Sequence, residues 1–199
     1  MARRTEHSEA QIKAMVLQAA KTLVTEEGVG ALKVREIAME IGYTVGCIYK
    51  VFDNMADLIL QLKAITLDDL AAQLAQIPTT LPPEQHLLAL MQTYLAFARQ
   101  NFHRWQMLST QRLTLEPLPV WYQEKHAAIF QEGELFFQQL AGNTTAAQQQ
   151  QAARILWASV HGLCSLSMTE KDNPTRTAEI EHDVLRLTQS FIAGWLATV

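Results

Sequence analysis

The chain has 199 residues, of which 49% are apolar and 18% are charged, and its formal net charge is −4 at pH 7. This length allows one compact domain or a small domain fused to a larger one, and the low charged share leaves apolar faces to bury in a dimer interface or a ligand cavity. A net negative charge alone argues against nucleic-acid binding. However, residues 1–56 carry seven Lys/Arg and seven acidic residues, so the excess acidity lies outside them. Charge therefore does not exclude a nucleic-acid-binding region at this end of the chain.

Helical patterns begin near the N-terminus. The run that starts at Ser8 fits a capping box, which begins a first helix. A second helix is expected over 34–41, where apolar residues recur at the spacing of one helical face. Gly42 suits the left-handed position just past a helix end, and Thr44 is a good N-cap for a short third helix over 45–52. The spacing predicts two short helices joined by a three-residue turn.

The two faces of the third predicted helix differ in kind. Ile48 and Phe52 stand four residues apart and are expected in the core. The other face consists of Val45, Gly46, Cys47, Tyr49 and Lys50. Small residues allow a helix to approach base edges closely, while Tyr and Lys reach phosphates, so this face predicts a helix that enters the major groove of DNA. Two short helices joined by a Gly-containing turn also occur as plain packing in many all-α proteins.

Longer helices follow. Asn54, with Asp57 three residues later, fits the N-cap of a long helix, and the Pro/Thr-rich loop at 77–83 is the clearest break in the chain. Further helices are expected at about 83–101, 102–112, 117–141, 145–169 and 174–197. The sequence thus predicts an all-α fold of about nine helices, with a helix-turn-helix DNA-binding domain at 1–54 and a helical ligand-binding and dimerisation domain at 55–199.

Short runs between residues 8 and 62 occur in an order and spacing typical of one family. They are Ala19, Ala20 and Leu23 in the first helix, Glu27-Gly28, Val34-Arg35-Glu36-Ile37-Ala38, Gly42-Tyr43-Thr44-Val45-Gly46, Ile48-Tyr49, Phe52-Asp53-Asn54 and Asp57-Leu58-Ile59. On these residues, the first third of the chain resembles the N-terminal domain of the TetR family of bacterial transcription regulators. The resemblance implies a three-helix head, a connecting helix and a helical body. We hypothesise a ligand-responsive repressor that binds a palindromic DNA operator as a homodimer.

The resemblance implies roles for the polar and small side chains of the head. The expected contacts are Thr44, Tyr49 and Lys50 with phosphates, Val45, Gly46 and Cys47 in the major groove, Arg35 with a base edge or phosphate, Lys33 with the DNA backbone, and Arg3 and Arg4 in the adjacent minor groove. Three residues depart from the family pattern. Lys33 stands where Ser or Thr often caps the second helix, Met55 replaces the usual Lys, and Cys47 stands where Thr is common. Because phosphate contacts would be few, we expect modest DNA affinity.

The last two predicted helices carry broad apolar stripes. In the family these helices usually form a four-helix interface between two subunits. The residues expected in this interface are Leu156, Val160, Leu163, Val184, Leu187, Phe191 and Trp195. Alternatively, both stripes pack inward on their own subunit. We expect the dimer because reading a palindrome requires two heads.

Trp157, His161 and Gly162 resemble the Trp–His–Gly signature of one class of C-terminal domains in these regulators. His161 is either a satisfied core histidine or a ligand contact. Most aromatic side chains of the middle helices are expected in the core, and a subset is expected to line a site for a small, mostly apolar effector. The expected pocket residues are Tyr94, Trp105, Trp121, Tyr122, His126, Trp157 and His161. Three arginines between residues 99 and 112 leave an anionic group on the ligand possible.

Catalytic, metal and membrane functions find no support in the sequence. The six histidines show no i,i+4 pair, and no glycine-rich phosphate loop or G-x-S-x-G run occurs, so we expect no enzyme, metal or cofactor. Two distant cysteines, Cys47 and Cys164, indicate a reducing, cytoplasmic setting, and the uncharged apolar run at 155–168 is too short to span a bilayer. The competing interpretation is an all-α small-molecule-binding protein or enzyme that keeps a vestigial helix-turn-helix only as packing.

Overall fold

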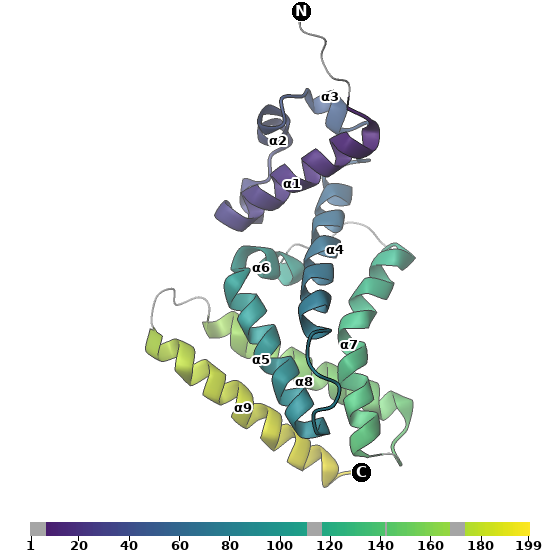
Figure 1. Cartoon of the computed structure of the whole chain (residues 1–199), viewed down its shortest axis with the longest axis vertical. Helices are drawn as coiled ribbons and strands as arrows, with labels where there is room; N and C mark the ends of the chain where they lie inside the picture. Colours follow the sequence, from purple (N-terminus) through teal and green to yellow (C-terminus); the bar gives the residue numbers. More distant parts are fainter. Residues whose placement is uncertain (1–6, 111–116, 142, 168–173) are drawn as a thin grey trace, which may run out of the picture. The chain divides into compact units, whose positions relative to one another are not determined.

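The computed structural model describes residues 7–110, 117–141, 143–167 and 174–199 (Figure 1). The described residues form nine α-helices and one short 3₁₀-helix, and no strand occurs among them, so the all-α prediction is confirmed. The helices are α1 (Glu9–Glu27), α2 (Val34–Glu40), α3 (Val45–Ile48), α4 (Met55–Leu74), α5 (Pro83–Gln100), α6 (Phe102–Thr110), α7 (Val120–Leu140), α8 (Ala146–Ser167) and α9 (Pro174–Leu196), and the 3₁₀-helix is η1 (Val29–Ala31).

Local polar patterns locate two helix starts correctly. At the start of α1, the backbone N–H of Gln11 donates to Ser8 Oγ over 3.3 Å, and the backbone N–H of Ser8 donates to Gln11 Oε1 over 2.8 Å, which completes the predicted capping box. Before α4, the backbone N–H of Asp57 donates to Asn54 Oδ1 over 3.0 Å, as the spacing predicted. Such caps satisfy N–H groups that have no partner inside a helix.

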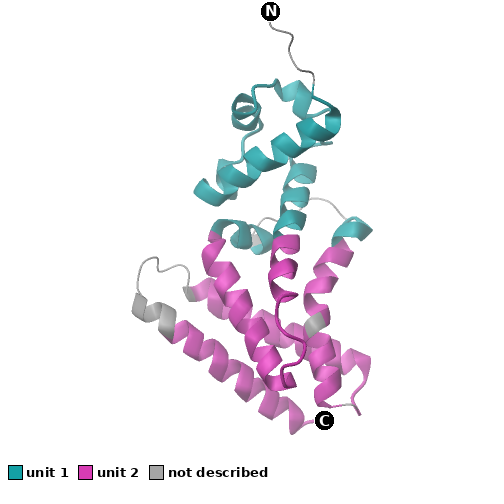
Figure 2. Cartoon of the chain, viewed as in Figure 1, with its two compact units in different colours: residues 1–66, 103–122 teal, residues 67–102, 123–199 magenta. Residues whose placement is uncertain are grey.

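The chain forms two compact units (Figure 2). The head unit comprises residues 1–66 and 103–122, and the body unit comprises residues 67–102 and 123–199. Helix α4 therefore supplies residues to both units. The head unit extends beyond the predicted domain boundary at residue 54, because the start of α4 and most of α6 group with it.

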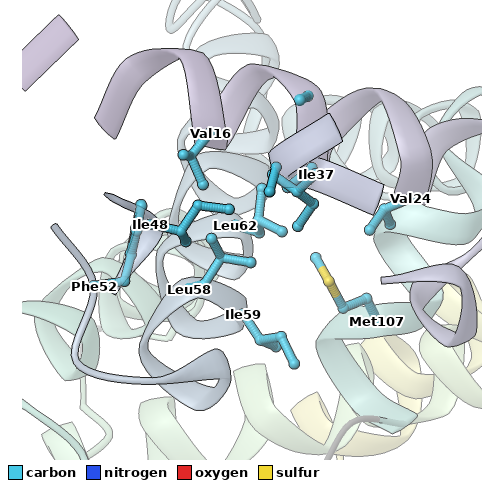
Figure 3. Packing of buried hydrophobic residues seen from close by; sticks show 12 residues of the cluster. Val16, Val24, Ile37, Ile48, Phe52, Leu58, Ile59, Leu62 and Met107 are labelled. Atoms are coloured by element: carbon cyan, nitrogen blue, oxygen red, sulfur yellow. The ribbon is translucent and has the colours of Figure 1, made fainter. Parts of the chain in front are cut away.

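An apolar cluster fills the inside of the head unit (Figure 3). Its larger members are Val16 and Val24 from α1, Ile37 from α2, Ile48 from α3, Phe52, Leu58, Ile59 and Leu62 from α4 and the segment before it, and Met107 from α6. Every one of these side chains is at most 8% exposed. Short helices such as α2 and α3 are marginal alone, so their packing on this cluster stabilises them.

Helices α5, α8 and α9 pack against one another in the body unit. An ion pair of 2.8 Å between Arg99 Nη1 and Glu181 Oε1 joins α5 to α9, and another between Lys125 and Asp68 joins α7 to the second part of α4. Both pairs are well exposed, so each contributes at most about 1 kcal/mol. The apolar contacts between the helices therefore carry most of the stability of this unit. None of the described helices is long and apolar enough to cross a membrane.

Candidate DNA-binding face and ligand cavity

Two backbone hydrogen bonds close the turn between α2 and α3. The N–H of Tyr43 donates to the carbonyl of Ala38 over 2.9 Å, and the N–H of Gly42 donates to the carbonyl of Met39 over 3.2 Å. This pairing is the Schellman motif, which ends a helix with a left-handed residue. Gly42 takes that position with φ +71°, and a Cβ there would meet nothing within 4 Å. The backbone conformation, rather than lack of space, therefore requires glycine, and the sequence prediction for Gly42 is confirmed.

Helix α3 is shorter than the helix predicted over 45–52. It ends at Ile48, and the chain continues in turns, in which the N–H of Phe52 donates to the carbonyl of Ile48 over 3.0 Å. Gly46 and the β-branched Val51 both disfavour a longer helix in this short segment. Ile48 and Phe52 are nonetheless buried, at 1% and 2% exposure, as their spacing predicted.

Thr44 precedes α3 as the N-cap residue, but its side chain does not cap the helix. Its Oγ1 lies 3.3 Å from Cys47 Sγ, so the hydroxyl meets a thiol where a backbone N–H was expected, and that part of the prediction is wrong. Thr44, Gly46, Tyr49 and Lys50 are exposed, whereas Val45 and Cys47 are half-buried. Tyr49 keeps 44% of its surface exposed although it is aromatic. This segment presents small and polar groups outward while Ile48 anchors it.

The preceding helix adds cations near this face. Arg35 of α2 is exposed, and Lys33 Nζ lies 3.1 Å from Glu36 Oε1 in an exposed ion pair, which a DNA phosphate can replace at little cost. Arg3 and Arg4 lie outside the described residues. His7, which was not among the predicted site residues, places its Nδ1 2.6 Å from the Tyr43 hydroxyl. No spacing rule predicts this contact, because 36 residues separate the two.

A small apolar cavity lies within the body unit. Its lining consists of Leu74, Leu87, Leu90, Met91, Tyr94, Ile129, Phe130, Gly133, Phe137, Ala153, Leu156 and Trp157. Its volume is about 30 Å³, which has room for one or two water molecules. Gly133 and Ala153 bring α7 and α8 close together at this point, because a Cβ at Gly133 would lie 3.4 Å from that of Ala153.

Three polar aromatic side chains meet beside this cavity. The Tyr94 hydroxyl lies 2.6 Å from His161 Nδ1, and the His161 ring stacks on Trp157 with centroids 4.9 Å apart. Burial lowers the pKa of His161 below its ordinary value, which favours the neutral ring at pH 7. Trp157 Nε1 is buried and has no hydrogen-bond partner among the described residues. Three side chains that can form hydrogen bonds therefore lie together beside an otherwise apolar space.

The structure gathers only part of the predicted pocket. Tyr94 and Trp157 line the cavity, and His161 touches both. His126 is exposed, with its ring 5.2 Å from Phe130, which the prediction omitted. The other predicted pocket residues, Trp105, Trp121 and Tyr122, belong to the head unit and do not line the cavity. Aromatic character alone does not indicate which unit a side chain packs in.

The predicted dimer interface needs a correction. Leu156, Val160 and Val184 are 1%, 0% and 1% exposed within their own subunit, so they cannot offer surface to a partner. Phe191 and Trp195 are half-buried: their ring centroids lie 6.1 and 4.8 Å from that of Phe137, and both residues also line an open groove between α8 and α9. Leu163 and Leu187 are half-buried. The inward alternative therefore applies to Leu156, Val160 and Val184, whereas the interface stays a prediction for the four half-buried residues.

The two thiols differ in burial. Cys164 is fully buried, and burial raises its pKa to about 12, so it carries almost no thiolate at pH 7. Cys47 is half-buried beside Thr44. Among the described residues, no group of three His, Cys, Asp or Glu side chains is arranged to hold a metal ion.

A helix-turn-helix head joined to a helical body with an apolar cavity is the architecture of a DNA-binding regulator that responds to a small molecule. The family model of the bacterial regulatory proteins of the tetR family matches residues 16–62, and that of the tetracyclin repressor-like C-terminal domain matches residues 87–187. The chain belongs to the TetR family and is therefore a ligand-responsive DNA-binding transcription regulator. The predicted family and general function are confirmed, and Trp157, His161 and Gly162 lie within the second matched range.

Solved structures share the fold over nearly the whole chain. A protein of unknown function from Rhodococcus sp. RHA1 is 18% identical, with a TM-score of 0.73 over 98% of both chains. A transcriptional regulator from the same organism is 20% identical, with a TM-score of 0.72 over 92% of this chain and 96% of the other. A tetR-family transcriptional regulator from Streptomyces coelicolor is 16% identical, with a TM-score of 0.67 over 96% of this chain and 90% of the other. Among curated proteins, no sequence matches the chain significantly.

Proposed function

We propose that this regulator is a homodimeric repressor, which binds a palindromic operator through two heads and is released by a small, mostly apolar effector in the body cavity. The observation that carries the DNA-binding part is the exposed face around α3. Gly46, Tyr49 and Lys50 face solvent there, while Ile48 anchors the segment in the head core. A fixed backbone that presents a small residue first and polar residues next suits close approach to a groove.

Each exposed group of this face has a proposed role. Gly46 lets the backbone approach base edges, beside Val45 and Cys47. Tyr49 and Lys50 bind phosphates, together with Thr44. Arg35 of α2 reaches a base edge or phosphate, and Lys33, the residue before α2, gives up its ion pair with Glu36 to bind the DNA backbone. For Arg3 and Arg4, which lie outside the described residues, the proposed role is contact with the minor groove. Phosphate contacts fix the position of the head, and contacts to base edges select the sequence.

For the dimer, we propose the exposed stripe of α8 in place of the buried one. Ile155 and Leu166 are 46% and 72% exposed, although large apolar side chains such as Leu156 and Val160 on the same helix are buried. Ala158 and Gly162 lie between them at helical spacing, and a Cβ at Gly162 would meet nothing within 4 Å in its own subunit. Exposed apolar residues flanking small ones support an interface in which two helices approach closely.

Helix α4 is the proposed link between effector and DNA. Leu58 and Leu62 belong to the head core, whereas Leu74, near the other end of the same helix, lines the cavity. An effector that enlarges the cavity would displace Leu74 and with it the helix. Release from DNA then requires that the effector binds more tightly to the free form than to the DNA-bound form.

The test is a mobility shift on the DNA upstream of the gene, with nonspecific competitor and a salt series. We expect a dimeric complex whose log K falls with log salt. Lys50→Ala should flatten that slope by about 0.9 for each phosphate that a head no longer neutralises. Lys125→Ala is the matched control, since Lys125 pairs with Asp68 in the body unit, and it should leave the slope unchanged.

Two results would count against the proposal. Wild-type binding no tighter than binding to competitor would leave the protein without an operator in this DNA. An unchanged slope in Lys50→Ala would remove that residue from the phosphate contacts while leaving the family assignment intact.

A further inference from the structure

Trp157 is held on several sides within the body unit. Its ring lies 4.9 Å from that of His161 in a stack, 5.1 Å from that of Phe130 and 6.0 Å from that of Tyr94, the last two edge to face. Such contacts each contribute about 0.5–1.5 kcal/mol beyond simple burial. The indole therefore has a defined orientation at the wall of the cavity.

The indole nitrogen of this residue lacks a partner. Trp157 Nε1 is buried without a hydrogen bond among the described residues. Leaving a buried donor unsatisfied costs about 1–3 kcal/mol, and most buried polar groups in folded proteins do have a partner. Indole N–H is a donor only, so the missing partner must be a hydrogen-bond acceptor.

The cavity wall restricts what that acceptor belongs to. All twelve lining residues are apolar or aromatic and uncharged, with Tyr94 as the only hydroxyl. That hydroxyl already pairs with His161 Nδ1, and burial of His161 favours its neutral form. A charged ligand would lose its hydration without gaining a counter-ion, at a cost that a small site does not offset. The occupant is therefore neutral, and the rings of Tyr94, Phe130 and Phe137 favour a flat, aromatic one.

We propose that the body cavity binds a small neutral aromatic ligand that carries one carbonyl-type acceptor, and that this acceptor receives the hydrogen bond of Trp157 Nε1. The inference rests on the proposed function, because it describes the effector of that same cavity. At about 30 Å³, the cavity must widen to admit a ring. Met91, which lines it, has an unbranched and adaptable side chain that can move aside.

The experiment compares two probes of nearly the same shape, acetophenone and α-methylstyrene, which differ by a C=O in place of a C=CH₂ group. Their dissociation constants are measured by calorimetry on the full-length wild type and on Trp157→Phe, which keeps a ring but removes the N–H. We expect the ratio of the two constants to shift by about tenfold towards the hydrocarbon in Trp157→Phe, as expected for the removal of one hydrogen bond. Trp121→Phe, in the head unit, is the control and should keep the wild-type ratio.

Two outcomes would overturn the inference: an unchanged ratio in Trp157→Phe, and no binding of either probe. An unchanged ratio together with a loss of stability in Trp157→Phe would indicate that an internal water accepts from the indole. Urea unfolding of each variant confirms that it is folded. Operator binding without probe separates the two proposals: a wild type that binds DNA and rejects both probes keeps the proposed function and loses this ligand.

Discussion

The head unit carries its proposed functional groups on the surface, whereas the body unit carries them beside an internal cavity. In the head, the apolar cluster of Figure 3 fills the inside, and the groups proposed to bind DNA, such as Tyr49 and Lys50, stand on the surface. In the body, Tyr94 and Trp157 line an apolar cavity, and His161 touches both of them. A surface that binds DNA needs a rigid support, whereas a site for an effector needs space that can open. Substitutions should therefore affect the two units in different ways.

The largest expected effect comes from emptying the head core. Ile37 of α2 is fully buried, whereas Met39, two residues later, is 78% exposed. Ile37→Ala should lower the free energy of unfolding by about 2–5 kcal/mol, because it leaves a cavity in a packed cluster. It should also weaken operator binding, since α2 and α3 rest on that cluster. Urea unfolding and the mobility shift measure both effects.

Met39→Ala is the matched control on the same helix and should change stability by less than about 0.5 kcal/mol. Binding of acetophenone should survive Ile37→Ala at temperatures where the protein stays folded, because the cavity lies in the body unit. Equal losses in both alanine variants would contradict the picture of a rigid core beneath α2.

Glycine substitutions should change the free energy of unfolding by less than Ile37→Ala does. The sign of the change should differ between the two units. Gly42 has φ +71°, so Gly42→Ala should destabilise the head by about 1–2 kcal/mol through backbone strain. Gly162 lies within α8, and a Cβ there meets nothing in its own subunit, so Gly162→Ala should stabilise the single subunit by up to about 1 kcal/mol. Urea unfolding at two protein concentrations compares the variants.

The same Gly162→Ala variant tests the proposed dimer face. If two copies of α8 approach closely at Gly162, the added methyl group should weaken the dimer although it stabilises the subunit. Sedimentation of the variant should then show more monomer than the wild type. A variant as dimeric as the wild type would move the interface away from this position.

Features set by neighbouring residues were predictable from the sequence. The capping box at Ser8, the cap at Asn54 and the left-handed Gly42 depend on residues within five positions of one another, and all three are confirmed. The early end of α3 was not predicted, because its spacing of Ile48 and Phe52 fits both a helix and the observed turns. Local patterns therefore located the turn better than the length of the helix that follows it.

Features set by long-range packing were less predictable. Val160 and Ile155 are both apolar residues of α8, yet one is buried in its own subunit and the other is exposed. A helix with apolar residues on two sides gives no sign in its sequence of which side meets a partner. The Tyr94–His161 hydrogen bond, 67 residues apart in sequence, was likewise beyond the reach of spacing, although both residues were expected near a ligand.

A further expected effect is a dependence on pH that arises in the head unit. Lys63 of α4 is 3% exposed, its Nζ donates to the carbonyl of Leu108 over 3.2 Å, and burial lowers its pKa to about 8. In the unfolded chain the pKa of a lysine is about 10.4. Below pH 8 both states are protonated, and between about pH 8 and pH 10.4 the unfolded chain retains a proton that the folded protein releases. The contribution of Lys63 to stability therefore rises with pH across this window.

Lys63→Met removes this titration and keeps a side chain of similar length. Relative to the wild type, the free energy of unfolding of the variant should fall between pH 7.5 and pH 10, because only the wild type gains stability from Lys63 as pH rises. Other titrating groups are common to both proteins, so their contributions cancel in the difference, which urea unfolding at several pH values provides. If the free energies of unfolding of the two proteins change with pH in parallel, Lys63 keeps an ordinary pKa in the folded head. Its ammonium group would then be in contact with water, unlike the side chains of Ile37 and Ile48.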